Sequence, residues 1–329
     1  MRLGGVSMKK YVEIGIIAVV VIALSVLSLV FGPLDLTQRQ LDTLLILAII
    51  TGASALYCFV VGEIARNNSQ MDKLWSLLPI AYAWVIAGKG DMSPRLVIFA
   101  IIVTLWGVRL TFNFARKGAY SWKFWSGEED YRWQVLRKNK YLSNRIAWGA
   151  FDLFFISIYQ NTLVLAICLP ALACMESTAP LGAWDYIAMT AALEFLLLEA
   201  IADEQQMAFH RTKRKLLNEG RKLEELPEPF NKGFNTTGLW GYSRHPNYLG
   251  EQGMWFALYV FTLGAGVTTY GIFNWSMIGS LFLIFLFLGS SSFQESVSNS
   301  KYPEYKIYLA HVSKYIPLWK YKPEKYIEK

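Results

Sequence analysis

The feature that most restricts the fold of this chain is a series of long apolar blocks. Residues 11–31 contain one charged side chain, Glu13, near the start of the block. A run of about 20 apolar residues is long enough to cross the hydrocarbon core of a membrane as a helix. Helices are the expected solution there, because backbone polar groups must be paired inside a membrane. The sequence therefore predicts an all-α integral membrane protein.

Seven further apolar blocks follow along the 329-residue chain, at 43–61, 74–88, 96–115, 147–171, 182–202, 248–271 and 273–293. We therefore expect a polytopic transmembrane helical bundle of about eight spans. Pro79 interrupts the third block, and seven spans with that segment re-entrant is the alternative count. The first block follows Lys9 and Lys10 but is longer than the apolar part of a signal peptide, so we expect it to be a retained anchor helix.

The basic residues predict the orientation of the spans. The net charge is +7, and nearly all Lys and Arg lie at the N-terminus, in the loops 62–73, 116–146 and 203–247, and in the tail from 294. The other loops hold three, Arg39, Lys89 and Arg95. Short loops rich in Lys and Arg stay in the cytoplasm. We therefore expect both termini to be cytoplasmic, in a bacterial inner membrane.

Two patterns bear on partners and metals. Cys58, Cys168 and Cys174 have no C-x-x-C spacing, so a disulfide framework is not indicated. The three histidines are far apart and form no H-E-x-x-H pattern, so no metal site is predicted. The loop 116–146 mixes Trp and Tyr with basic residues, which suits an interfacial helix in the headgroup layer. We expect contacts with membrane lipids and a lipophilic small molecule, and none with nucleic acid.

Polar residues at the cytoplasmic span ends are the first candidates for chemistry, because ionisable groups near a membrane are costly. Glu199 and Asp203 are four residues apart, so one helix face presents both. A second group, Y-S-R-H-P-N-Y-L-G-E, opens the seventh block. Pro246 disfavours helix at the residue before it. A helix is therefore expected to start near Asn247, on a face shared with Glu251.

Arg244 and His245 precede this predicted helix start. The backbone N–H groups and the dipole at a helix N-terminus favour an anion, and the arginine fork suits phosphate or carboxylate. A cofactor carrying either group is therefore chemically reasonable here. A polar helix cap, or a plain charge network around Glu199 and Asp203, is the alternative. The tail that begins at Gln294 and Glu295 can fold back over this group.

A further polar group lies in the N-terminal half of the chain. Asp72 and Trp75 share a helix face at the start of the third block, Glu63 precedes them, and Tyr82 lies within the block. A carboxylate in the first turn of a helix is favourable by itself. That is the alternative explanation for Asp72.

These motifs resemble the signature of the steroid 5α-reductase superfamily of membrane proteins, and more narrowly its DUF1295 branch. The matching patterns are S-x-x-D-x-x-W from Ser69, E-x-x-x-D-x-Q from Glu199, and G-L-W-x-Y-S-R-H-P-N-Y-x-G-E from Gly238. The resemblance covers roughly residues 40–320. It implies a seven-span reductase core at 41–329, with a cofactor half at about 182–329, after an anchor helix and loop at 1–40.

The resemblance also implies an activity in lipid metabolism, the NADPH-dependent reduction of a lipophilic enone that is steroid- or isoprenoid-like. No G-x-G-x-x-G is required in this superfamily. The implied cofactor-binding residues are Glu199, Asp203, Arg244, His245, Asn247, Tyr248, Glu251 and Glu295. The substrate would enter from the bilayer between N-terminal spans. Hydride addition builds negative charge on the carbonyl oxygen, so an acid or hydroxyl donor is needed there. The candidate catalytic residues are Glu63, Asp72 and Tyr82.

A second resemblance keeps another chemistry open. R-H-P-x-Y followed by a Glu near a Tyr-rich tail is similar to the isoprenylcysteine and phospholipid methyltransferases, in which such residues cradle S-adenosylmethionine. Here they would be Arg244, His245, Tyr248 and Glu295. The characterised reductases lack the His-Pro pair, and fold alone does not choose between the two activities. A lipid-binding or structural protein without catalysis is a third possibility.

Overall fold

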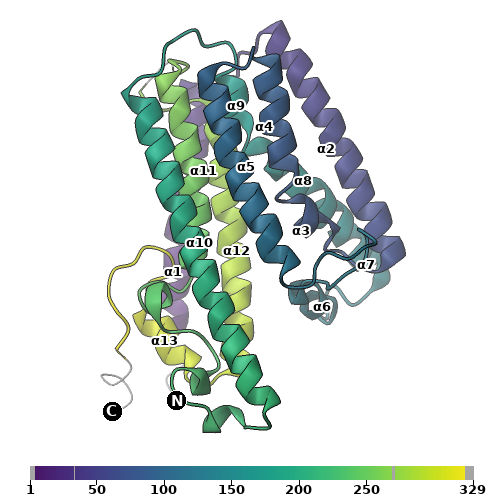
Figure 1. Ribbon diagram of the computed structural model, residues 1–329, viewed down its shortest axis with the longest axis vertical. Helices are drawn as coiled ribbons and strands as arrows, with labels where there is room; N and C mark the ends of the chain where they lie inside the picture. Colours follow the sequence, from purple (N-terminus) through teal and green to yellow (C-terminus); the bar gives the residue numbers. More distant parts are fainter. Residues whose placement is uncertain (1–3, 33, 269–270, 323–329) are drawn as a thin grey trace. The chain divides into compact units, whose positions relative to one another are not determined.

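The computed structural model describes residues 4–32, 34–268 and 271–322 (Figure 1). These residues form helices and turns and contain no β-strand; one isolated parallel bridge joins Ser243 and Ser313. The predicted all-α fold is confirmed.

Each predicted apolar block contains helix. The longer helices are α1 (Gly4–Phe31), α2 (Gln38–Ala65), α4 (Leu78–Lys89), α5 (Pro94–Ala115), α10 (Ala183–Asn218), α11 (Pro246–Gly264) and α12 (Ile278–Lys301). The shorter ones are α3 (Gln70–Leu74), α6 (Tyr131–Arg137), α7 (Arg145–Phe151), α8 (Gln160–Ala166), α9 (Leu169–Ala173) and α13 (Tyr305–His311). A π-helix, η1 (Asp152–Tyr159), joins α7 to α8. Short 3₁₀ turns are η2 (Leu223–Glu225), η3 (Phe230–Lys232), η4 (Gly238–Gly241) and η5 (Trp275–Met277).

Several of these helices can cross a membrane. Four helical stretches in the described chain are long and apolar enough, namely Gln38–Ala65, Pro94–Ala115, Arg145–Ala166 and Trp275–Lys301. Helix α4 has only 12 residues. At 1.5 Å per residue it is about 18 Å long, shorter than a hydrocarbon core of about 30 Å. The chain is thus an integral membrane protein, and the total of about eight spans stays a prediction.

The chain divides into two compact units. One contains the described parts of 1–21, 193–254 and 284–329, and the other contains the described parts of 22–192 and 255–283. We call them the C-terminal unit and the N-terminal unit, after the source of most of their residues.

In the N-terminal unit, α4 lies beside α5, and α2 packs against α4, η1 and α8 (Figure 1). The indole rings of Trp106 and Trp255 are both fully buried and meet edge to face at 5.1 Å. Gly107 lets α5 come close to the segment before α4, since a Cβ there would lie 2.4 Å from the carbonyl oxygen of Ser76. Buried aromatic and aliphatic side chains therefore form the core of this unit.

The loop 116–146 differs from the expected interfacial helix. It contains only the seven-residue α6 and the start of α7, separated by turns. Gly118 and Gly127 adopt positive φ angles of 82° and 111°, which break any continuous helix. Lys73 is fully buried and donates to the carbonyl oxygens of Phe124 and Ser126 at 2.6 and 2.7 Å. Specific polar contacts to the corner after α2 therefore replace the predicted helix.

The C-terminal unit is held by an aromatic cluster at its tail. Phe234, Tyr305, Tyr308, Val312 and Tyr321 are all buried together. The hydroxyl of Tyr308 donates to the carbonyl oxygen of Trp240 at 2.6 Å. This packing attaches the segment after α12 to the loop that precedes α11.

Candidate functional site

The turn before α11 is the centre of the candidate site. Helix α11 begins at Pro246, next to the predicted start at Asn247, and Ser243 before it forms an isolated bridge with Ser313. The backbone N–H groups of Arg244 and His245 donate to the carbonyl oxygens of Ser313 and Lys314 at 2.9 and 3.0 Å. The C-terminal tail therefore folds back over the turn, the arrangement expected from the sequence.

Glu295 on α12 binds this turn through its side chain. Its carboxylate is fully buried and accepts hydrogen bonds from Arg244 Nε at 2.8 Å and from His245 Nε2 at 3.1 Å. The ammonium of Lys314 lies 3.9 Å away and completes the charge cluster. Arg244 also donates through Nη1 to the carbonyl oxygens of Leu309 and Val312. Arg244 is thus engaged inside the protein rather than presented to an exposed anion.

The imidazole of His245 is shaped by burial and by an aromatic neighbour. Burial lowers its pKa, and the hydrogen bond with Glu295 opposes that shift. The ring stacks on Tyr248 with centroids 5.4 Å apart and planes at 20°. The hydroxyl of Tyr248 accepts from Gln294 Nε2 at 2.5 Å. The four residues named by the methyltransferase resemblance therefore meet in one cluster.

The reductase candidates lie where α10 and α11 pack closely. A Cβ at Gly250 would fall 2.6 Å from Glu199 Cβ, so the two helices can approach only because this residue has no side chain. Asn247 Nδ2 donates to Asp203 Oδ1 at 3.2 Å. Glu199 and Glu251 are both buried, with exposed fractions of 2% and 6%. The structure thus brings amide and carboxylate groups together along one helix pair.

The N-terminal candidates have separate partners. Asp72 accepts from Trp133 Nε1 at 2.8 Å and from Arg132 at 3.3 Å, so it ties α3 to the loop 116–146. Burial raises the pKa of Asp72, and Arg132 opposes this shift. Tyr82 is fully buried, and its hydroxyl lies 2.8 Å from the hydroxyl of Thr51. Glu63 is half-buried near the end of α2. The structure does not gather these three residues at one point.

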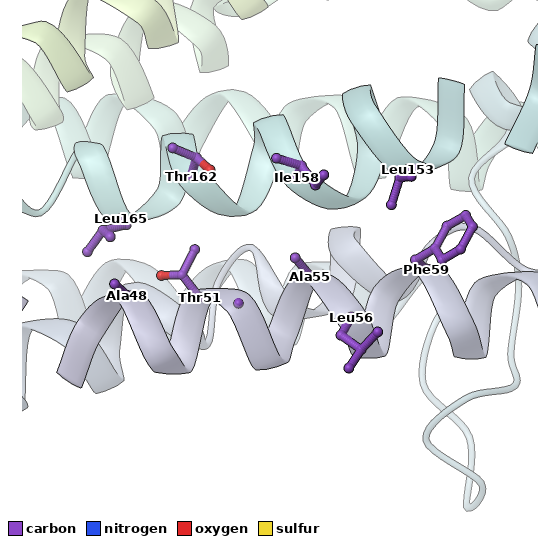
Figure 2. A pocket seen from close by; sticks show the side chains of 10 residues that line it. Ala48, Thr51, Ala55, Leu56, Phe59, Leu153, Ile158, Thr162 and Leu165 are labelled. Carbon is purple, nitrogen blue, oxygen red and sulfur yellow. The ribbon is translucent and has the colours of Figure 1, made fainter. Parts of the chain in front are cut away.

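An apolar groove lies next to the Thr51–Tyr82 pair. It has a volume of about 510 Å³ and runs between α2 and the η1–α8 stretch (Figure 2). Its lining residues are Ala48, Thr51, Gly52, Ala55, Leu56, Phe59, Leu153, Ile158, Thr162 and Leu165. Thr51 therefore connects a groove suited to a lipid chain with the buried phenol of Tyr82.

Two polar residues escaped the sequence analysis. Lys314 lies in a tail where nothing in the pattern marks it. Asp152 is fully buried and stands at the start of η1. It is an acidic residue inside the fifth apolar block, which is the signal that could have identified it. In the described part of the chain, no group of three or more His, Cys, Asp or Glu side chains is placed to hold a metal ion.

Comparison with known proteins gives the following. Residues 58–312 match the family described as "Protein of unknown function (DUF1295)". An uncharacterized protein of the fission yeast Schizosaccharomyces pombe is 33% identical over an alignment of 282 residues that covers 80% of this chain and 78% of the relative. No solved structure matches. The match confirms the resemblance to the DUF1295 branch. Membership of the wider steroid 5α-reductase superfamily stays a prediction.

Proposed function

The chain belongs to the DUF1295 family, and from this premise we propose that it is a membrane-embedded, NADPH-dependent reductase of a lipophilic enone, steroid- or isoprenoid-like. The observation that carries the proposal is the hydrogen bond between Asn247 and Asp203. It joins two of the positions that the reductase resemblance assigns to the cofactor, one on each of two closely packed helices.

The donor and acceptor groups at this helix pair fit a hydroxyl-rich, anionic cofactor. Carboxylates such as Asp203 and Glu251 can accept bonds from ribose hydroxyl groups, and the Asn247 amide can both donate and accept. Exposed cations follow on the same helix, since Arg211 and Arg214 lie about two and three turns after Asp203 on α10. NADPH would supply the hydride. Within the protein, Asp203, Asn247 and Glu251 would hold and orient it.

The substrate end of the proposed reaction belongs to the N-terminal unit. The apolar groove gives a lipid chain a place to lie, and the Thr51–Tyr82 hydroxyl pair is a polar point beside it. A hydroxyl donor near a developing enolate oxygen stabilises the transition state. We propose Tyr82 for this role, with Glu63 and Asp72 as the further acidic candidates.

A ligand titration tests the proposal. Purified protein in detergent is titrated with NADPH, and the unfolding midpoint is followed. A ligand in large excess over its Kd should stabilise the fold by about 2–4 kcal/mol. Asn247→Ala and Glu251→Gln should reduce the shift, whereas Glu304→Gln, an exposed carboxylate in the same unit, should not. An NADPH shift that both site variants retain in full would refute the assigned residues.

One observation favours a second function, that of an S-adenosylmethionine-dependent membrane methyltransferase. Arg244, His245, Tyr248 and Glu295 meet in one cluster, and three of them, Arg244, His245 and Glu295, are buried. The same titration with S-adenosylmethionine separates the two activities. Stabilisation by S-adenosylmethionine alone would exclude the reductase activity. Stabilisation by neither ligand would favour a lipid-binding protein.

We also propose that both termini face the cytoplasm, on the strength of the basic loops. The bacterial inner membrane remains a prediction, and the fission yeast relative shows that similar chains occur in eukaryotes. Single cysteines placed in the loop 116–146 should react with a membrane-impermeant maleimide only from the cytoplasmic side. Labelling from the outside would reverse the topology.

A further inference from the structure

Asp152 is an acidic side chain in the interior of a membrane protein. It is fully buried, and it lies within Arg145–Ala166, one of the stretches that can cross a membrane. An ionisable group in such a place is costly and calls for a functional explanation. Neither the reductase motifs nor the methyltransferase motifs include this residue.

The carboxyl group of Asp152 has only weak hydrogen bonding. Ser157 Oγ donates to Oδ1 at 3.4 Å, and Oδ2 has no hydrogen-bond partner among the described residues. A Cβ at Gly62 would lie 3.7 Å from this Oδ2 and 3.4 Å from Nδ2 of Asn68, an amide nitrogen that is buried and also lacks a partner there. An acceptor and a donor therefore face the same small space above Gly62.

The charged groups nearest to Asp152 are not paired with it. None of the ion pairs formed by the described residues includes it. The charged groups that act on it are Glu63 on α2 and Arg137 on α6, and Arg137 already forms an ion pair with Glu129 and donates to the side-chain oxygen Oδ1 of Asn68. A buried carboxylate without a paired cation binds a proton instead.

A stripe of small residues, two of them with polar side chains, leads from Asp152 into the unit along the buried face of α2. Gly62, Cys58 and Thr51 lie on that face and are all buried. Thr51 and Gly62 are eleven residues apart, which is about 16 Å along a helix. Gly62 borders Asp152, Cys58 lies 3.7 Å from Asn161 Nδ2, and Thr51 contacts Tyr82.

The opposite side of the stripe is the π-helix and the turn that follows it. Asn161 Nδ2 also donates to the carbonyl oxygen of Ser157 at 2.7 Å, so Asp152, Ser157 and Asn161 form one series of contacts. The i→i+5 winding of a π-helix is rare and is found mostly at functional sites. In η1 it places Ser157, five residues after Asp152, within reach of the carboxyl group.

We propose that Asp152 is a proton-carrying residue, which takes up a proton at the loop face beside Asn68 and passes it inward along this stripe. The inference rests on the proposed function for its purpose. After hydride addition to an enone, the enolate takes one proton. The Asp152 carboxylic acid would release that proton, become a carboxylate and regain a proton from water at the loop face, with no electron transferred in this step.

Infrared spectroscopy tests the proposal without a substrate. A protonated carboxyl group has a C=O stretching band that a carboxylate lacks. At neutral pH this band should be present in the wild type, be lost in Asp152→Asn and persist in Glu63→Gln, which removes the neighbouring carboxyl group. If Asp152→Asn does not fold, Ser157→Ala should shift the band by removing its hydrogen bond. Identical spectra for the wild type and Asp152→Asn, or an unmoved band in Ser157→Ala, would overturn the proposal.

The uptake route has its own readout. Transfer into D₂O shifts the band as the proton exchanges, and Asn68→Val should slow that exchange several-fold. An unchanged exchange rate would exclude entry beside Asn68.

The NADPH titration keeps the two proposals distinguishable. If the carboxyl band is lost in Asp152→Asn and NADPH does not stabilise the wild type, the protonated Asp152 is supported and the reductase activity is refuted. An NADPH shift without the band would remove only the proton carrier.

Discussion

The buried ion pair between Arg95 and Asp185 gives the sharpest stability prediction. Arg95 Nε and Nη2 donate to the two carboxylate oxygens of Asp185 at 2.6 and 3.0 Å, and the two side chains are 4% and 2% exposed. The guanidinium also donates to Ser177 and to the carbonyl oxygens of Ala179, Pro180 and Gly264. One side chain thus joins the start of α5, the segment before α10 and the end of α11.

Removing one partner should be much more costly than removing both. Arg95→Leu leaves a buried carboxylate uncompensated, which typically costs about 3–5 kcal/mol. Arg95→Leu combined with Asp185→Leu should cost less than the single change, because an apolar pair has no charge to desolvate. Arg95→Lys should fall between the wild type and Arg95→Leu, since lysine keeps the charge but loses the bidentate geometry.

The chain offers a matched control in the same unit. Arg39 and Asp91 form an equally bidentate pair at 2.9 and 2.7 Å, but their side chains are 44% and 80% exposed. Arg39→Leu should leave the unfolding midpoint unchanged, because water screens an exposed pair. Unfolding in detergent, by heat or by added SDS, measures both pairs. Equal effects of Arg95→Leu and Arg39→Leu would refute the argument that burial sets the cost.

Three further predictions concern other parts of the molecule. Gly250→Ala should destabilise the fold by about 1–3 kcal/mol through overpacking against α10, whereas Gly289→Ala, which meets open space, should be close to neutral in the same unfolding assay. Burial lowers the pKa of His245 in the folded state. At a pH below about 6.5, the ordinary pKa of histidine, His245 therefore binds more protons in the unfolded chain than in the folded one. Stability should fall as the pH drops below this value, and His245→Gln should flatten the dependence of the unfolding midpoint on pH. Lys73→Met removes two bonds to the loop 121–126, and limited proteolysis should cleave that loop faster than in the wild type.

The helices were predictable because their signal is local. An apolar run of sufficient length needs no information about its neighbours, so every predicted block contains helix. The start of α11 was equally accessible, since Pro246 restricts the residue before it and fits the first turn of the helix. The number of spans was not predictable, because an apolar block can form a helix such as α4 that is too short to cross a hydrocarbon core by itself.

The site was only partly predictable because its contacts join distant segments. The motif around Arg244 was identifiable from the sequence. Lys314, whose carbonyl oxygen accepts from the backbone of His245, is 70 positions after Arg244 in a tail without a recognisable motif. The loop 116–146 has the composition of an interfacial helix, yet contacts such as those of Lys73 hold it as turns. Tertiary hydrogen bonds of this kind override local composition. Asp152 was missed although it is an acid in an apolar block, and its proposed role depends on Gly62 and Asn68 being its neighbours.

A variant of Glu295 distinguishes two roles of the cluster before α11, a ligand site and a clamp that holds the C-terminal tail. Glu295→Gln leaves Arg244 and Lys314 buried without their counter-charge, which should cost about 3–5 kcal/mol. If the cluster is a clamp, hydrogen exchange in residues 305–318 should rise in this variant, because the tail is tied to the turn by Arg244.

Adding Arg244→Gln to Glu295→Gln removes the unpaired arginine charge and should recover part of the lost stability. A ligand role gives the opposite pattern, with stabilisation by S-adenosylmethionine lost while the tail stays protected from exchange. Since Arg244 already donates to Glu295 and to two tail carbonyl groups, we expect the first pattern. Unchanged hydrogen exchange in the tail of Glu295→Gln would contradict this reasoning and favour a ligand-binding role for the cluster, as in a methyltransferase.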